Sequence, residues 1–300
     1  MGQMDGRVAV VTGAGGGLGR EHALLLAAEG AKVVVNDLAG AKVVVEEIHA
    51  AGGAAVAVEG GVSDLAVGEQ LVTAAVQSFG DLHVVVNNAG VIRDAMLWNM
   101  TEEQFDLVLD VHLKGTFSVT RAAARYWREQ SKQGVTSDRS LVLTSSGSGT
   151  HGNVGQWNYS AAKAGLAIQA VNASRELARF GVRANAIAPV ARTTPVLATP
   201  GLGAVVGAPQ DDNAFDRYHP KHISPLVAYL STAGCPFTGQ VFSVYGGHVG
   251  LYQGWSLGHE INADRQWSVQ ELAEVMGADA FPKSLEAVAQ RIVPVEGAGH

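Results

Sequence analysis

Short apolar runs rich in valine alternate along this chain with alanine- and leucine-rich segments of helical spacing. RVAVVTG at 7–13 has the composition of a buried strand, and REHALLLAAEG at 20–30 that of a helix closed by a glycine. Strands that alternate with helices in this way form right-handed crossover units and a parallel sheet. We therefore predict an α/β fold with a doubly wound parallel sheet and helices on both faces. Further strands are expected at 31–37, 54–60, 82–90, 140–146, 182–189 and, as the last strand, 239–247, with a helix at 68–80.

The string GAKVVV occurs twice, at 30–35 and at 40–45. The first copy follows a glycine cap and ends in Asn-Asp, which is typical of a strand that leads into a turn. The second copy continues into EEIHAAGG, which has helical spacing. Because context outweighs intrinsic propensity, we predict a strand for the first copy and a helix for the second.

One catalytic domain is expected over residues 1–254, followed by a C-terminal extension over 255–300. Residues 190–222 have little regular pattern and several prolines, so we expect a mobile substrate loop over a site there. In the extension, SVQELAEVMG at 268–277 predicts a helix.

Composition narrows the class of protein. Hydrophobic residues make up 47% and charged residues 16% of the 300, which is typical of a well-buried globular core. No apolar run approaches the roughly 18 residues of a membrane span, and no signal-peptide pattern opens the chain, so we expect a cytoplasmic protein without membrane contact. The net charge of −7 argues against nucleic acid as a partner. The single cysteine, Cys235, excludes an intrachain disulfide.

A glycine-rich loop, TGAGGGLG at 12–19, follows the first expected strand and precedes the first expected helix. In that position backbone N–H groups and the helix N-terminus bind phosphate, as in Rossmann-like folds. The loop fits T-G-x-x-x-G-x-G through Thr12, Gly13, Gly17 and Gly19, and it also fits T-G-x-x-G-x-x-G through Gly16. The loop alone leaves both spacings open.

Asp37 ends the next expected strand. An acid at this point accepts hydrogen bonds from the adenosine ribose and repels a 2′-phosphate. Positions 14–16 and 38–40 hold no arginine or lysine that would bind such a phosphate. We therefore predict NAD as the cofactor and regard NADP as disfavoured.

Tyr159 and Lys163 lie four positions apart in NYSAAKAG. On a helix this spacing places both side chains on one face, with Cβ atoms about 5–6 Å apart. Such a pair is either ordinary surface chemistry or an acid–base group, because a lysine ammonium stabilises a phenolate and lowers the pKa of the tyrosine.

Together the glycine loop, NNAG at 87–90, Ser146 and the Tyr159–Lys163 pair resemble the short-chain dehydrogenase/reductase family, over about residues 6–250. NNAG is similar to the single-domain type within it. The resemblance implies that Tyr159 transfers the hydroxyl proton, that Lys163 tunes it and binds the nicotinamide ribose, and that Ser146, thirteen positions before the tyrosine, orients the substrate oxygen. It also implies dimers or tetramers.

The resemblance carries a set of cofactor contacts onto this chain. Thr193 is an alternative to Thr194, and GGVSD at 60–64 lacks the adenine-side acid of many members. The implied contacts are Thr12, Gly13, Gly17, Leu18, Gly19, Asp37, Leu38, Gly61, Val62, Asn88, Ala89, Gly90, Tyr159, Lys163, Pro189 and Thr194.

His112 stands where most family members have asparagine. The string VHLKGTF around it is similar to (3R)-hydroxyacyl-CoA dehydrogenases of the kind found in peroxisomal multifunctional enzyme type 2, so we assign His112 a relay or scaffold role, with simple packing as the alternative. The expected function is NAD-linked oxidoreduction of a secondary alcohol, a 3-hydroxyacyl-CoA. The alternatives are a steroid dehydrogenase, a 3-oxoacyl-ACP reductase and a non-catalytic dinucleotide sensor. No metal site is expected, because the ten histidines form no ligand spacing.

Overall fold

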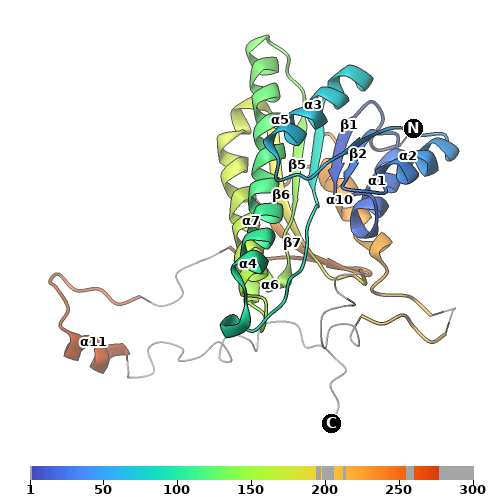
Figure 1. Cartoon of the computed structure of the whole chain (residues 1–300). Coiled ribbons are helices and arrows are strands. Elements are labelled where there is room, and N and C mark those ends of the chain that lie inside the picture. The colour runs from blue at the N-terminus through green and yellow to red at the C-terminus, as the bar shows by residue number, and fades with distance from the viewer. Residues whose placement is uncertain (1, 194–196, 198–205, 212–213, 255–259, 277–300) are drawn as a thin grey trace. The chain divides into compact units, whose positions relative to one another are not determined.

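The computed structural model of this protein describes residues 2–193, 197, 206–211, 214–254 and 260–276. Its centre is an eight-stranded sheet with the strand order β3-β2-β1-β4-β5-β6-β7-β8 (Figure 1). Seven strands are parallel, and β8 pairs antiparallel with β7. The strands are β1 Val8–Thr12, β2 Lys32–Asp37, β3 Ala54–Glu59, β4 Val84–Asn87, β5 Arg139–Thr144, β6 Val182–Pro189, β7 Val241–Tyr245 and β8 His248–Leu251.

Helices cover both faces of the sheet (Figure 1). One face is packed by α1 Gly17–Ala28, α2 Ala41–Ala50 and α10 Ser224–Ser231. The other face is packed by α3 Leu65–Phe79, α5 Gly115–Lys132 and α7 Trp157–Glu176. The shorter elements are α4 Glu102–Leu109, α6 Gly147–His151, the π-helical turn η2 Asp110–Lys114 and the 3₁₀ turns η1 Leu97–Asn99, η3 Ala178–Phe180 and η4 Pro220–His222.

Burial on both faces explains the unbroken apolar strands in the sequence. Along β1, Ala9 and Val11 point into one hydrophobic core, while Val8 and Val10 point into the other. A strand covered on both sides has no solvent face, so it shows no polar alternation. The predicted fold class, a doubly wound parallel sheet, is confirmed.

The strand order reverses between β1 and β4, which are neighbours in the sheet although β2 and β3 separate them in the chain. In open parallel sheets the crevice at such a switch point, beyond the carboxyl ends of the strands, is where ligands bind. The glycine loop follows β1 and the NNAG segment follows β4, so both are brought to this crevice.

The two copies of GAKVVV fold differently, as predicted: the first contributes to β2 and the second to α2. The prediction that 239–247 holds the last strand is wrong, because β8 follows it after the turn at Gly246 and Gly247. Gly246 has φ 49°, a conformation that glycine adopts without strain. Neighbouring glycines between two short apolar runs were the available hairpin signal.

The chain divides into two units, Met1–Tyr252 and Gln253–His300. In the second unit, α11 Val269–Val275 begins at Ser268, whose side chain accepts a hydrogen bond from the Glu271 backbone in a capping box. The role of this unit as an extension of the domain before it stays a prediction. Much of the expected 190–222 loop lies outside the described residues.

Within the described ranges, no helix has the length and apolar character needed to cross a membrane. The cytoplasmic location stays a prediction. Cys235 is buried and free.

Candidate active site

Ser146 lies two residues beyond the carboxyl end of β5, which is Thr144. It is the N-cap residue of α6, and its Oγ accepts a hydrogen bond from the Ser148 backbone N–H at 3.2 Å. The Ser146 hydroxyl also acts on the Tyr159 phenol, in the direction of a lower pKa. The strand end therefore holds the serine hydroxyl beside the tyrosine phenol.

Tyr159 and Lys163 both project from the first turns of α7 into the site. Lys163 is 3% exposed, and its Nζ lies 5.4 Å from the centre of the Tyr159 ring. The same Nζ donates a hydrogen bond to the carbonyl oxygen of Thr144, the last residue of β5, at 2.6 Å. The structure thus brings together the three residues that the sequence predicted, on α6, α7 and the end of β5.

Burial dominates the ionisation of this pair. It raises the pKa of Tyr159 to about 12, and the negative charge of Asp94 acts in the same direction. Burial also lowers the pKa of Lys163 to about 7. The lowering of the tyrosine pKa that we expected from the lysine is therefore wrong for the protein chain by itself, because desolvation of the phenolate outweighs the attraction of a lysine that is itself desolvated.

His112 is a buried wall of the site, on η2. Its ring meets the Tyr159 ring edge-on, with centres 5.3 Å apart. Burial, with the neighbouring charge of Lys163, lowers its pKa to about 3, so the ring is neutral at neutral pH. Nε2 lies 2.8 Å from the Val91 carbonyl oxygen, and Nδ1 has no hydrogen-bond partner.

Gly90, the last residue of NNAG, is required by this histidine. A Cβ at position 90 would lie 2.3 Å from Cε1 of His112. The backbone after β4 therefore passes directly over the imidazole ring, and only glycine allows that approach.

Thr12 ties the glycine loop to NNAG across the switch point. Its Oγ1 accepts hydrogen bonds from the backbone N–H groups of Asn88 at 3.0 Å and Ala89 at 3.1 Å. In return, Nδ2 of Asn88 donates to the carbonyl oxygens of Thr12 and Gly13, both at 3.1 Å. These bonds fix the two loops on either side of the crevice.

The glycine loop forms a cradle with the properties of a phosphate site. A Cβ at Gly13 would lie 2.6 Å from Cα of Ala89, and one at Gly19 would lie 2.1 Å from the carbonyl oxygen of Gly13. At Gly16, the N-cap of α1, a Cβ would meet open space. The first turn of α1, which holds Gly17 and Leu18, carries no acidic residue, so its N–H groups and dipole favour an anion. These residues fit a dinucleotide pyrophosphate.

Asp37 is the residue on which the cofactor prediction depends. Its Oδ2 accepts a hydrogen bond from the Gly15 N–H at 2.8 Å, and Oδ1 accepts one from the Leu38 N–H at 2.7 Å. A carboxylate has about four lone-pair sites, so this one can also accept hydrogen bonds from ribose hydroxyls. The structure therefore holds the acid at the mouth of the glycine loop.

The remaining predicted contacts surround this crevice. Leu38 is 75% exposed and lies next to Gly61, while Val62 is buried and packs against Gly115. Asp64, the acid of GGVSD, is the N-cap residue of α3, and its Oδ1 accepts a hydrogen bond from the Ala66 N–H at 2.8 Å.

Pro189 ends β6 at the carboxyl edge of the sheet, where the cofactor prediction places it. Thr194 lies outside the described residues. Its alternative, Thr193, has its methyl group 3.9 Å from a Cβ built on Gly17.

Ser145 has a role that the sequence analysis did not assign. It is 1% exposed, and its Oγ donates to the Lys163 carbonyl oxygen at 2.6 Å. Asn158 is likewise buried, and its Nδ2 donates to the carbonyl oxygens of Arg93 and Gln104. Both residues hold α7 in place. The only feature of the sequence that could have pointed to them is that each directly precedes a predicted catalytic residue.

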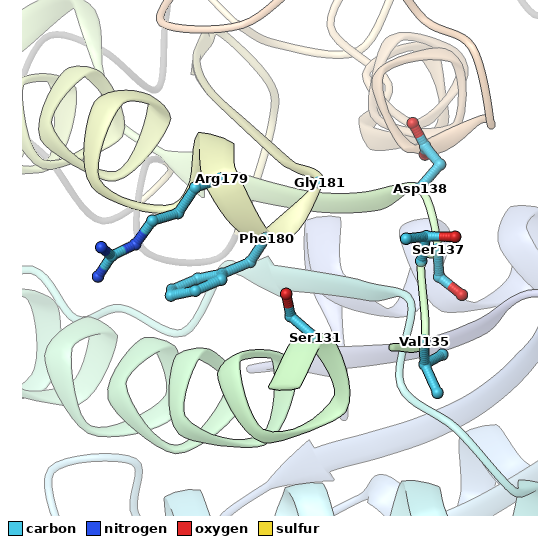
Figure 2. Close-up of a pocket in the computed structure, with 8 residues that line it drawn as sticks. Ser131, Val135, Ser137, Asp138, Arg179, Phe180 and Gly181 are labelled. Atoms are coloured by element: carbon cyan, nitrogen blue, oxygen red, sulfur yellow. The ribbon is translucent and has the colours of Figure 1, made fainter. Parts of the chain in front are cut away.

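Two hollows lie outside the catalytic constellation. A cavity of about 310 Å³ lies before the amino ends of β5 and β6, lined by Ser131, Val135, Thr136, Ser137, Asp138, Arg179, Phe180 and Gly181 (Figure 2). It is at the edge of the sheet opposite to Ser146. A groove of about 460 Å³ lies beside the start of α7, lined mainly by apolar residues that include Met96, Leu97, Trp98, Val154 and Trp157.

Residues 7–200 match the family model described as short chain dehydrogenase. The chain therefore belongs to the short-chain dehydrogenase family. Members of this family are oxidoreductases that act on CH–OH groups with a nicotinamide dinucleotide.

Particular relatives are more informative than the family. The chain is 45% identical to hydroxyacyl-CoA dehydrogenase ChsB1 of Mycobacterium tuberculosis, over 91% of this chain and 88% of that one. It is 44% identical to peroxisomal multifunctional enzyme type 2 of Drosophila melanogaster, over 78% of this chain but only 38% of the larger protein. A crystal structure of a short chain dehydrogenase from Mycobacterium avium superposes with a TM-score of 0.84 and 45% identity, covering 94% of this chain and 98% of that one.

The depressed lysine pKa has a consequence for stability. A group whose pKa is lower in the folded than in the unfolded state contributes stability that is complete above the unfolded pKa and is lost as the pH falls through the folded one. For Lys163 this window runs from about 10.4 down to about 7. From pH 7 to pH 10, the unfolding free energy of the cofactor-free wild-type protein should rise more than that of Lys163→Met. The difference between the two increases should be on the order of 3 kcal/mol. Denaturant titrations at both pH values measure this, and parallel pH profiles of the two proteins would contradict it.

Proposed function

We propose that this protein is an NAD-dependent dehydrogenase of 3-hydroxyacyl-CoA thioesters, with Ser146, Tyr159 and Lys163 as its catalytic residues. The observation that carries the proposal is the convergence of these three side chains at the carboxyl end of β5, next to the switch-point crevice with its glycine loop. The 45% identity to a hydroxyacyl-CoA dehydrogenase over nearly the whole chain supports the choice of substrate.

Each residue has one task in the oxidation of the alcohol. Ser146 and Tyr159 hydrogen-bond the substrate oxygen. Tyr159 takes the hydroxyl proton as the C–H bond at the same carbon breaks and the carbonyl forms. Oxidised NAD bound in this crevice would supply the hydride acceptor and a positive charge that favours the phenolate. Lys163, held by the Thr144 carbonyl, supplies a second cation when protonated and is the residue that would bind the nicotinamide ribose.

His112 supports this machinery as a neutral group. If Nε2–H donates to the Val91 carbonyl oxygen, Nδ1 is an acceptor. We assign it the place of the usual asparagine, which holds a water between the lysine and solvent. The unpartnered Nδ1 supports this role over simple packing, because a buried polar atom ordinarily has a partner.

The substrate assignment is tested by initial rates of nicotinamide reduction with (3R)- and (3S)-hydroxyacyl-CoA, a steroid alcohol and simple secondary alcohols. We expect turnover of the (3R) thioester with NAD⁺. Turnover of steroid or simple alcohols alone would contradict the acyl-CoA assignment while keeping the catalytic residues.

Variants complete that test. Tyr159→Phe should lower kcat by roughly a hundredfold or more, because general acid–base catalysis is lost. His112→Leu should lose activity, because leucine cannot hold the water. His112→Asn should keep most of the wild-type activity, because asparagine can. Near wild-type turnover by Tyr159→Phe would refute the catalytic assignment.

The preference for NAD follows from charge at the adenosine end of the crevice. Asp37 presents a carboxylate there, and nearby cations are already paired: Arg20 with Glu47, and Lys42 with Glu59. A ribose 2′-phosphate would be repelled by the Asp37 carboxylate. Neither Arg20 nor Lys42 could neutralise it without breaking its ion pair.

The double variant Asp37→Ser, Leu38→Arg should reverse this preference. The ratio of kcat/KM for NADP⁺ to that for NAD⁺ should rise roughly tenfold to a hundredfold, the weight of one or two charge-assisted hydrogen bonds. Leu65→Arg, an exposed leucine at the start of α3, is the control for added positive charge. An unchanged ratio in the double variant would remove Asp37 as the determinant.

We further propose a homodimer or homotetramer that forms through α5 and α7. Three large apolar side chains are exposed on these helices: Phe117 at 52%, Trp157 at 60% and Ile168 at 49%. An apolar surface of this kind marks an interaction site.

Sedimentation at micromolar concentration should therefore show an oligomer, and Ile168→Asp should shift it toward the monomer. Val43→Asp is the matched control, because Val43 is equally exposed but lies on α2, against the other face of the sheet. A wild-type monomer would refute the assembly.

A further inference from the structure

Gln156 is a buried amide immediately before α7, with partners on three sides. It is 1% exposed. Its Nε2 lies 3.1 Å from each carboxylate oxygen of Asp94. Its Oε1 accepts hydrogen bonds from Ser148 Oγ at 2.8 Å and from Asn153 Nδ2 at 3.1 Å. Because both the nitrogen and the oxygen of this buried amide are hydrogen-bonded, the side chain is held in one orientation. The position of Asp94 therefore affects the position of Ser148 and of the residues around Ser146.

The chain of hydrogen bonds continues from Gln156 to the catalytic residues. Ser148, whose hydroxyl binds Gln156, donates its backbone N–H to Ser146 Oγ at 3.2 Å. The hydrogen bonds therefore connect Asp94 to Ser146 through Gln156 and Ser148. The Ser146 hydroxyl in turn acts on the Tyr159 phenol.

The backbone around Asp94 is fastened to the same place. The Ala95 N–H donates to the Gly155 carbonyl oxygen at 2.9 Å, and Asn158 Nδ2 donates to the Arg93 carbonyl oxygen at 3.1 Å. The segment that follows NNAG is thus held on both sides of Asp94 against the start of α7. The backbone on either side of Asp94 is therefore fixed, and the carboxylate itself is held by the Gln156 amide.

We infer that Asp94 is a positioning residue that acts through Gln156: it holds the Ser146 loop against Tyr159 and keeps a fixed negative charge facing the phenol. This role rests on the proposed function, since it concerns the same tyrosine. It assigns a purpose to two residues that neither the glycine loop nor the Ser–Tyr–Lys pattern includes.

The charges that face Tyr159 come from three elements. Lys163 lies on α7 itself, His112 lies on η2, and Asp94 lies on the segment after β4. Because His112 is neutral at neutral pH, Asp94 and Lys163 are the two opposing charges. Lys163 favours the phenolate when it is protonated, whereas Asp94 favours the protonated phenol. Asp94 therefore adds to the rise in the Tyr159 pKa that burial causes, and removing its charge should let Tyr159 act as a base at lower pH.

Asp94→Asn removes the negative charge at this position. It keeps a side chain of the same shape with an oxygen that accepts the hydrogen bond from Gln156, so it tests the role of the charge alone. In the oxidation direction, the pH at which kcat is half-maximal should fall by about half a unit or more. KM for NAD⁺ should stay within about twofold, since Asp94 lies outside the cofactor contacts. Asp106→Asn makes the same charge change at an exposed site on α4 and should leave the profile unchanged.

Gln156→Leu tests the positioning part. It removes the bonds to Asp94 and Ser148 at similar volume, and we expect kcat to fall roughly tenfold or more with little change in KM for NAD⁺. Thermal melts establish that each variant is folded. An unchanged pH midpoint in folded Asp94→Asn would overturn the charge role, and undiminished kcat in folded Gln156→Leu would overturn the positioning role.

Failure of the proposed function is recognised separately. If wild-type protein turns over no acyl-CoA thioester, that proposal fails and the inference is tested without turnover. NMR titration of selectively labelled tyrosine, assigned with Tyr159→Phe, measures the phenol in the NAD-bound protein. A lower titration midpoint in Asp94→Asn than in wild type supports the inference, and equal midpoints refute it.

Discussion

The site depends on how α7 is fastened to the end of β5. Lys163 Nζ donates to the Thr144 carbonyl oxygen, and Ser145 Oγ donates to the Lys163 carbonyl oxygen, both at 2.6 Å. These bonds join the last residue of a central strand and its successor to the helix that carries the tyrosine. This junction also places Ser146, the next residue after Ser145, beside Tyr159. NNAG follows β4, the strand next to β5, and so lies at the same edge of the sheet. The geometry of the proposed chemistry is a consequence of one strand–helix junction.

The same junction has an electrostatic cost, because it buries two groups whose charged forms are needed. Burial raises the pKa of Tyr159 and lowers that of Lys163, so the protein alone favours a neutral pair. A buried site makes each added charge more effective. Asp94 acts in the same direction as burial on this phenol, and the positive charge of a bound oxidised nicotinamide would act against both.

The doubly wound sheet and the converging loops were predictable, since strand–helix alternation leaves few topologies and parallel strands bring Ser146 and the glycine loop to one edge. The contacts that orient the site were not. Nothing in the sequence shows that the Ser145 hydroxyl donates to the Lys163 carbonyl oxygen. Nor does the sequence show that Gln156 contacts Asp94, which lies 62 positions away in the chain. β8 was missed because it is an edge strand with exposed Val249 and Leu251, so it lacks the run of buried valines that marks the equally short β4. Side-chain partners depend on tertiary distances, which spacing in one sequence does not contain.

The most direct test is a crystal structure of the protein with NAD⁺ and a (3R)-hydroxyacyl-CoA, trapped with Tyr159→Phe or at low pH. The account predicts that the substrate's C3 oxygen lies within hydrogen-bond distance, about 2.6–3.2 Å, of Ser146 Oγ and of the position of the Tyr159 hydroxyl. The hydrogen on C3 should face the nicotinamide ring of the NAD⁺ whose pyrophosphate lies on the glycine loop. An acyl-CoA bound with its C3 oxygen away from both residues would contradict the central claim.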